Sequence, residues 1–176
     1  MGFGEAIRTC FRKYVVFQGR ARRSEYWYFY LFSILAGFAA GILDAIVEGV
    51  SGTSGSLGFR NSGPFAAVLN LALFLPSIAV TVRRLHDTNR SGWLLLGFVG
   101  YVIVAIIVFI AVLSATKGGA GAAPGANGPS IVAAVVLALG GLGYAIFLFI
   151  CMVQNGTVGQ NGYGPDPKAP DVEVFS

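Results

Sequence analysis

Four long runs of apolar residues restrict what this chain can fold into more than any other feature. They lie at about 26–47, 64–82, 92–115 and 130–153. A helix that crosses a lipid bilayer needs about 20 largely apolar residues, because the hydrocarbon core is about 30 Å thick and each residue adds about 1.5 Å. We therefore predict an all-α membrane protein with four transmembrane helices.

The composition excludes an ordinary soluble domain. Charged residues make up 11% of the chain and hydrophobic residues 55%, with a mean hydropathy of +0.72. Soluble domains carry about 25% charged residues, because they need a polar surface. No internal repeat is visible, so we expect a single membrane domain over residues 1–176.

Lysine and arginine are concentrated on one side of the predicted membrane. Ten of the 12 lie before the first span, between the second and third, or after the fourth. Only Arg60 and Lys117 lie in the connections on the other side. Because basic loops stay in the cytoplasm, we predict that both termini, including a tail over 154–176, are cytoplasmic.

A shorter helix is predicted ahead of the first span, over residues 3–17. Phenylalanine, tyrosine and small apolar residues recur there at helical spacing, and Arg8, Arg12 and Lys13 occupy the other face. One interpretation is an interfacial amphipathic helix whose basic residues face anionic lipid head groups. The other is a helix that packs on the protein's own cytoplasmic side.

The residues that usually carry chemistry are few. Cys10, Cys151 and the single histidine, His86, form no zinc ligand set, so we expect no metal and no cofactor. His86 and Asp87 suggest acid–base chemistry, but adjacent residues rarely face one another and no nucleophile motif accompanies them. We therefore predict no catalytic residue, and a membrane enzyme is the weakest of three functional interpretations.

Three polar segments stand out at the predicted cytoplasmic ends of the spans: 17–27 (FQGRARRSEYW), 75–93 (LPSIAVTVRRLHDTNRSGW) and 156–167 (GTVGQNGYGPDP). The first two suit helix ends anchored by aromatic and basic residues. The third has too many Gly and Pro residues to continue a helix, so on physical grounds alone it predicts a disordered tail.

Together the three segments resemble the patterns FxGRARRxEYW, LPSxAVxxRRLHDxxRSGW and GxxGxNxYGxDP of the domain of unknown function 805 family of small bacterial inner-membrane proteins. The resemblance covers nearly the whole chain, with departures at Asn89 and Gln160. It implies a four-helix protein of the bacterial inner membrane, and it brings no established activity.

The expected topology places these segments at one membrane surface, where we predict a shared basic cluster. Its candidate anion-binding or lipid-binding residues are Arg20, Arg22, Arg23, Arg83, Arg84 and Arg90. Its expected network partners are Glu25, His86 and Asp87. Guanidinium groups can hold a phosphate, or they can form ion pairs with the two carboxylates. Plain positive-inside anchoring would also explain the arginines.

The opposite ends of the first two spans carry the polar residues Asp44, Glu48 and Asn70. Ionisable groups within spans suggest a transport or channel component, although these carboxylates can also simply reach outer-surface water. The leading interpretation remains a non-enzymatic membrane protein whose basic cytoplasmic face binds anionic lipid or a protein partner, and the transport or channel component is the alternative. A homo-oligomer is a further interpretation, and no nucleic acid is expected.

Overall fold

In a computed structural model, the chain is described over residues 1–51, 63–117 and 127–168. The regular elements of these residues are five α-helices. They are α1 (Phe3–Arg12), α2 (Arg23–Ser51), α3 (Pro64–Asp87), α4 (Trp93–Lys117) and α5 (Asn127–Val153). The all-α prediction, with one short helix ahead of four long ones, is confirmed.

Four of these helices are long and apolar enough to cross a bilayer. With 24 to 29 residues each, they measure about 36 to 43 Å at about 1.5 Å per residue. They therefore extend beyond a hydrocarbon core of about 30 Å. The extra length includes Arg83–Asp87, which lies beyond the predicted end of the second span at about 82 and continues α3 to its end.

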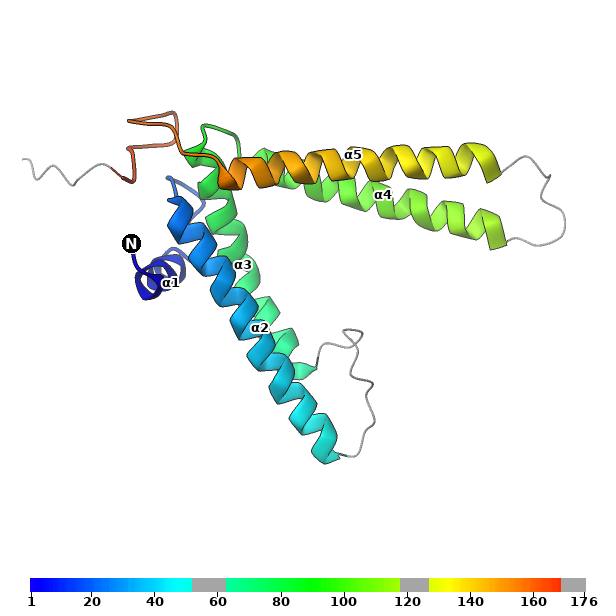
Figure 1. The fold of residues 1–176 in the computed structure, drawn as a ribbon, viewed down its shortest axis with the longest axis horizontal. Helices are drawn as coiled ribbons and strands as arrows, with labels where there is room; N and C mark the ends of the chain where they lie inside the picture. Colours follow the sequence, from blue (N-terminus) through cyan, green and yellow to red (C-terminus); the bar gives the residue numbers. More distant parts are fainter. Residues whose placement is uncertain (52–62, 118–126, 169–176) are drawn as a thin grey trace, which may run out of the picture. The chain divides into compact units, whose positions relative to one another are not determined.

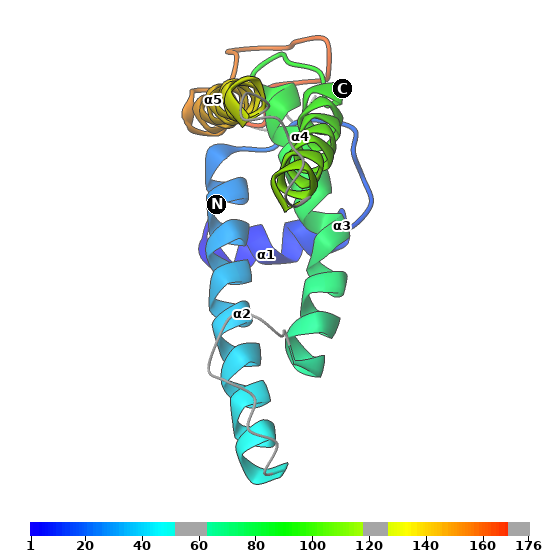
Figure 2. The same cartoon turned by 90° about the vertical axis from the view of Figure 1, so that its right-hand side faces the viewer.

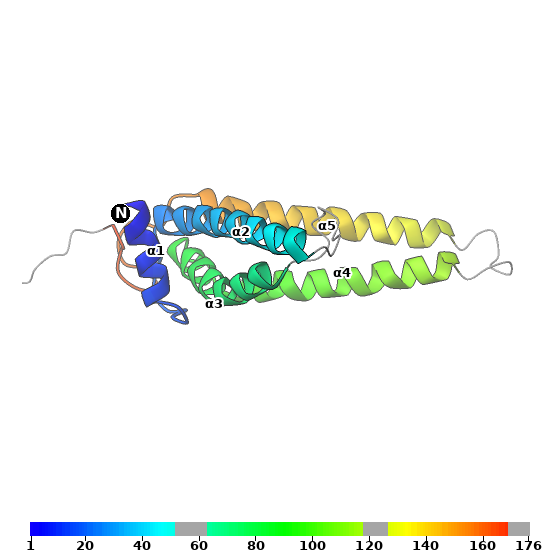
Figure 3. The same cartoon turned by 90° about the horizontal axis from the view of Figure 1, so that it is seen from below.

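The described residues form two compact units, and each is described by itself. The first contains residues 1–90 and 155–168, and the second contains residues 91–154. Helices α4 and α5 make up the second unit and lie side by side (Figures 1 and 3). The predicted outer connections, including Arg60, lie almost wholly outside the described residues.

In the first unit, α2 and α3 lie side by side and α1 crosses them (Figure 2). Ala6 and Cys10 of α1 are buried, because they are one helical turn apart and face the other helices. Phe11 contacts the rings of Phe29 and Phe32 on α2. One face of α1 therefore packs on the protein itself, as one of the two interpretations requires.

Helix α1 ends at Arg12, five residues earlier than the predicted end at residue 17. The chain must then turn to reach the start of α2. Gly19 adopts a positive φ of 84°, which favours glycine. Ala21 donates its backbone N–H to the carbonyl of Arg83 at 3.0 Å, which fixes this connection against the end of α3.

The second unit is held together by tyrosine side chains that bond to helix carbonyls. Tyr144 donates its hydroxyl to the carbonyl of Leu94 at 2.8 Å, and Tyr101 donates to Leu137. A Cβ atom at Gly97 would lie 2.9 Å from the Tyr144 hydroxyl, so only glycine leaves room for this contact. These bonds give the half-buried hydroxyls acceptors where lipid offers none.

Candidate functional site

The end of α3 lies beside the start of α2, and five charged residues meet there. We call them the arginine–carboxylate network, and they are Arg20, Glu25, Arg83, Arg84 and Asp87. All five are at most 6% exposed. Glu25 lies in the first turn of α2 and Arg84 in the last turn of α3, where each complements the helix dipole.

Asp87 is shared by two arginines. Nη2 of Arg20 lies 2.9 Å from one carboxylate oxygen, and Nε of Arg20 donates to the same oxygen at 3.0 Å. Arg84 donates to the other oxygen. Buried pairs of this kind depend on complete hydrogen bonding, and removing one partner costs about 3 to 5 kcal/mol.

Glu25 links the network to α1. Its carboxylate accepts a hydrogen bond from Nη1 of Arg83 at 2.6 Å. The thiol of Cys10 contacts the same carboxylate oxygen at 3.9 Å. Burial raises the pKa of the Cys10 thiol to about 12, and the negative charge of Glu25 adds to this shift.

The segment after α5, residues 155–168, lies against the network, and we call it the C-terminal segment. Arg20 donates to the carbonyls of Gly159, at 2.6 Å, and of Thr157. Thr157 in turn donates its backbone N–H to the carbonyl of Asp87 at 2.9 Å. Arg20 therefore holds both the end of α3 and the C-terminal segment.

Glycine is required where this segment passes Asp87. A Cβ atom at Gly156 would lie 2.0 Å from a carboxylate oxygen of Asp87, closer than any real contact. Farther along, Asp166 accepts hydrogen bonds from the backbone N–H groups of Lys168 and Gly159. These two bonds hold the pKa of Asp166 below its ordinary value.

His86 also contacts the C-terminal segment. Its ring stacks on Tyr163 with centroids 4.0 Å apart, and its Nδ1 lies 3.2 Å from the carbonyl of Gly19. Asn161 donates its side-chain amide to the carbonyl of His86 at 3.0 Å. Asp87 directs its carboxylate to arginines instead, so the two adjacent residues serve different contacts.

At the other end of α2 and α3, Asp44 caps a helix. Its two carboxylate oxygens accept the backbone N–H groups of Phe65 and Ala66, at 3.0 and 2.9 Å. These N–H groups belong to the first turn of α3 and have no partner within that helix. Asp44 is buried, Glu48 is half-buried and Asn70 is exposed on α3.

Comparison with known proteins identifies the family. The family model described as "Protein of unknown function (DUF805)" matches residues 14–165. The chain belongs to the DUF805 family. Inner membrane protein YhaH of Escherichia coli K12 is 32% identical over 160 residues, 89% of this chain and 91% of the relative. Inner membrane protein YhaI of the same strain is 40% identical over 102 residues, 56% of this chain and 76% of the relative. No solved structure matches the chain.

The DUF805 match and these relatives, together with four apolar helices, show that the chain is a multi-pass protein of the inner membrane. The three segments that carry the DUF805 resemblance are those that meet at the arginine–carboxylate network. Segment 17–27 supplies Arg20 and Glu25, segment 75–93 supplies Arg83, Arg84 and Asp87, and segment 156–167 supplies the carbonyls.

Most of the predicted basic cluster is therefore assembled. Arg22 and Arg23 are half-buried and donate to Pro167 and Asn155, in or beside the third DUF805 segment. Arg90 follows α3 and is exposed. The prediction that these arginines bind an anion or lipid stays a prediction.

The structure corrects the prediction of a disordered tail, because the C-terminal segment is ordered through Lys168. Composition could not reveal this, since the order comes from contacts with Arg20 and His86. Sequence reasoning also missed Cys10, Thr157 and Tyr163 as network neighbours. For Tyr163, a fixed position in the DUF805 pattern was the available signal.

Proposed function

We propose that this inner-membrane protein binds anionic phospholipid head groups through the basic face of α1 and the residue after it. The cations are Arg8, Arg12 and Lys13. We further propose that α1, both termini and the arginine–carboxylate network lie on the cytoplasmic side.

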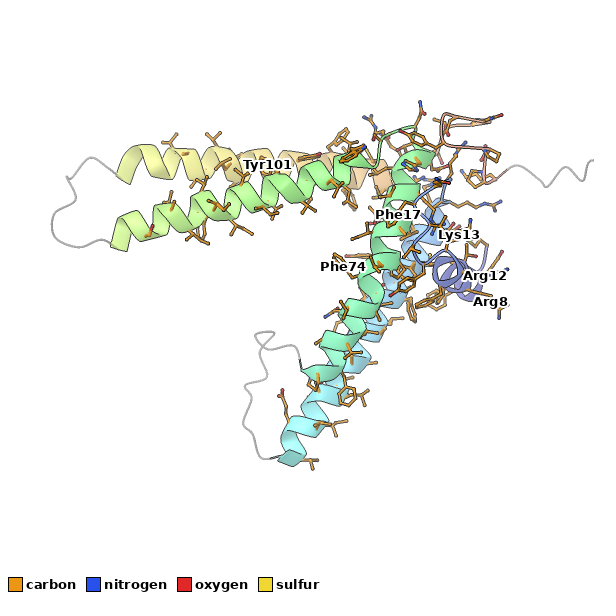
Figure 4. The ribbon with its side chains drawn as sticks, turned by 180° about the vertical axis from the view of Figure 1, so that it is seen from behind. Arg8, Arg12, Lys13, Phe17, Phe74 and Tyr101 are labelled. Atoms are coloured by element: carbon orange, nitrogen blue, oxygen red, sulfur yellow. The ribbon has the colours of Figure 1, made fainter. Side chains whose placement is uncertain are left out.

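The observation that carries this proposal is the exposure of these three cations. Arg8, Arg12 and Lys13 are all exposed and gather at α1 (Figure 4), whereas Ala6 and Cys10 of the same helix are buried. Because α1 crosses α2 and α3, it would lie along the membrane surface when those helices span the bilayer (Figure 2). Basic residues of such helices are attracted to anionic lipids.

Exposed aromatic rings beside these cations also suit the interface. Phe3, Phe11 and Phe17 are each about two-fifths exposed. Aromatic and aliphatic side chains of a surface helix insert at the boundary between head groups and acyl chains. This combination of cations and rings favours a lipid surface.

Arg20 and Arg84 suit head-group binding less well, because both already donate to acceptors within the protein. Arg20 donates to a carboxylate and to two backbone carbonyls, and Arg84 donates to Asp87. A lipid phosphate at either residue would have to displace these acceptors. The charge asymmetry of the sequence supports the cytoplasmic orientation, since ten of 12 lysines and arginines lie on that side.

The test replaces Arg8, Arg12 and Lys13 together by glutamine. Each basic residue near an anionic surface contributes about 1 kcal/mol, roughly a fivefold effect per residue. We therefore expect the amount of phosphatidylglycerol retained per protein, measured by mass spectrometry after extraction in mild detergent, to fall at least tenfold.

The matched control replaces Arg8 and Arg12 by lysine, which preserves the charge. Because attraction to a lipid surface depends on charge, this variant should retain phosphatidylglycerol like the unmodified protein. Retention that is unchanged in the glutamine variant would contradict the proposal. A reporter at the C-terminus checks that both variants keep the same orientation.

A further inference from the structure

One buried arginine has donors that the network does not use. Arg83 is fully buried, and its Nη1 donates to Glu25 at 2.6 Å. Among the described residues, nothing accepts a hydrogen bond from its Nε or its Nη2. These two nitrogens are neighbours on one edge of the guanidinium, the edge that binds two oxygens of one acid group side by side.

The arginine–carboxylate network also contains more positive than negative charge. Three arginines share two carboxylates, and all five side chains are buried. The network therefore carries one more positive than negative charge. Backbone carbonyls compensate Arg20, but none is bonded to Nε or Nη2 of Arg83. Buried charges in proteins are normally paired, because an uncompensated one is costly.

We infer that the Nε and Nη2 edge of Arg83 is a binding site for one oxyanion of the phosphate type. Two oxygens of the anion accept the two N–H groups, and its negative charge balances the excess charge of the network. The anion is either free phosphate or the phosphate of a lipid head group. This inference is independent of lipid binding by the exposed cations of α1.

Helix α1 controls access to this site. Cys10 of α1 contacts the carboxylate that pairs with Arg83, so α1 covers this part of the network. Access for the anion therefore requires that α1 moves, which also separates Phe11 from Phe29 and Phe32.

The test uses the full chain in a neutral detergent, with inorganic phosphate as the probe at constant ionic strength set by chloride. The midpoint of thermal unfolding should rise with phosphate and saturate, because a ligand that binds the folded state stabilises it. Arg83→Lys keeps the charge but loses the paired donors, so its phosphate affinity should fall at least tenfold. The glutamine variant at Arg8, Arg12 and Lys13 is the control and should respond like the unmodified protein.

A second variant keeps the test decisive if Arg83→Lys fails to fold. Glu25→Gln removes the negative charge beside Arg83 and so adds to the excess positive charge of the network, so phosphate should bind several-fold more tightly. Nanodiscs of phosphatidylglycerol or phosphatidylcholine, in a buffer without inorganic phosphate, identify the source. If phosphatidylglycerol nanodiscs raise the unfolding midpoint and Arg83→Lys removes this rise, the bound anion is a lipid head group. If only inorganic phosphate raises the midpoint, the bound anion is the free ion. No saturable stabilisation by either probe, or affinities unaffected by both variants, would overturn the inference.

Discussion

Asp87 connects several parts of the site. Its carboxylate holds Arg20 and Arg84, its backbone carbonyl accepts the N–H of Thr157, and it lies against Gly156. The residues around it therefore depend on one another, and small changes beside Asp87 should affect stability more than similar changes elsewhere in the C-terminal segment.

Gly156→Ala tests this dependence. The added Cβ would lie 2.0 Å from a carboxylate oxygen of Asp87, so the C-terminal segment must shift or Asp87 must leave its arginines. Overpacking of this kind costs about 1 to 3 kcal/mol. We expect the midpoint of thermal unfolding in detergent to fall by several degrees. Gly162→Ala is the matched control, because its Cβ would make only an ordinary contact of 3.8 Å with Asn89. Equal midpoints for the two variants would contradict the observed packing.

The raised pKa of Cys10 predicts how the thiol responds to pH. In the folded protein the pKa is about 12, against an ordinary value of 9.0. The protonated thiol therefore contributes stability below pH 9, and this contribution is lost as the pH rises from 9 towards 12. Only the thiolate reacts with alkylating reagents.

The measurement is alkylation by iodoacetamide in a Cys151→Ala background. We expect the folded protein to react far more slowly at pH 9 than the same protein in denaturant. Similar rates in the two states would show that the thiol is accessible and ionises normally.

At the scale of elements, α2 and α3 are joined by polar contacts at both ends. The arginine–carboxylate network links one end, and Asp44 links the other by capping the first turn of α3 from α2. Between these ends, the core of the unit consists of apolar side chains such as Phe29, Leu73 and Val80. Polar contacts at the ends fix the register of two helices whose apolar faces could otherwise slide.

Asp44→Ala should weaken this helix pair. It leaves the N–H groups of Phe65 and Ala66 without their acceptors, and loss of a helix cap costs about 0.5 to 2 kcal/mol. Asp44→Asn retains one oxygen acceptor and should lose less. The midpoint of thermal unfolding in detergent should be highest for the wild type, lower for Asp44→Asn and lowest for Asp44→Ala. If Ala matched wild type, the capping role would be wrong. If Asp44→Asn lowers ion or solute flux into liposomes without lowering the unfolding midpoint, a transport role for Asp44 would be favoured.

At the scale of the whole molecule, the ten-to-two distribution of basic residues predicts the topology. Reporter fusions after Arg90 and at Ser176 should report the cytoplasm, and fusions near Ser56 and Gly121 should report the opposite side. An even number of crossings returns the chain to its starting side. A fusion at Ser176 that reports the opposite side would therefore contradict the cytoplasmic assignment of both termini.

The sequence by itself determined the membrane-spanning architecture. Apolar runs long enough to cross a bilayer predict helices because lipid provides no hydrogen-bond partners for the backbone. The helical spacing of residues near the N-terminus predicted α1 as well, although its end at Arg12 depends on the turn towards Ala21. The motifs indicated which polar segments share a surface.

Only the tertiary structure decided how those polar residues are used. Arg83 belongs to α3, pairs with Glu25 of α2, and Glu25 is in turn contacted by Cys10 of α1. Whether Arg83 faces lipid or Glu25 therefore depends on how these three helices pack. The same holds for the C-terminal segment. Its glycines alone predict a flexible chain, whereas the contacts with Arg20 and His86 order it. Local sequence sets the propensity of a segment, whereas burial and pairing of charges arise from residues distant in the chain.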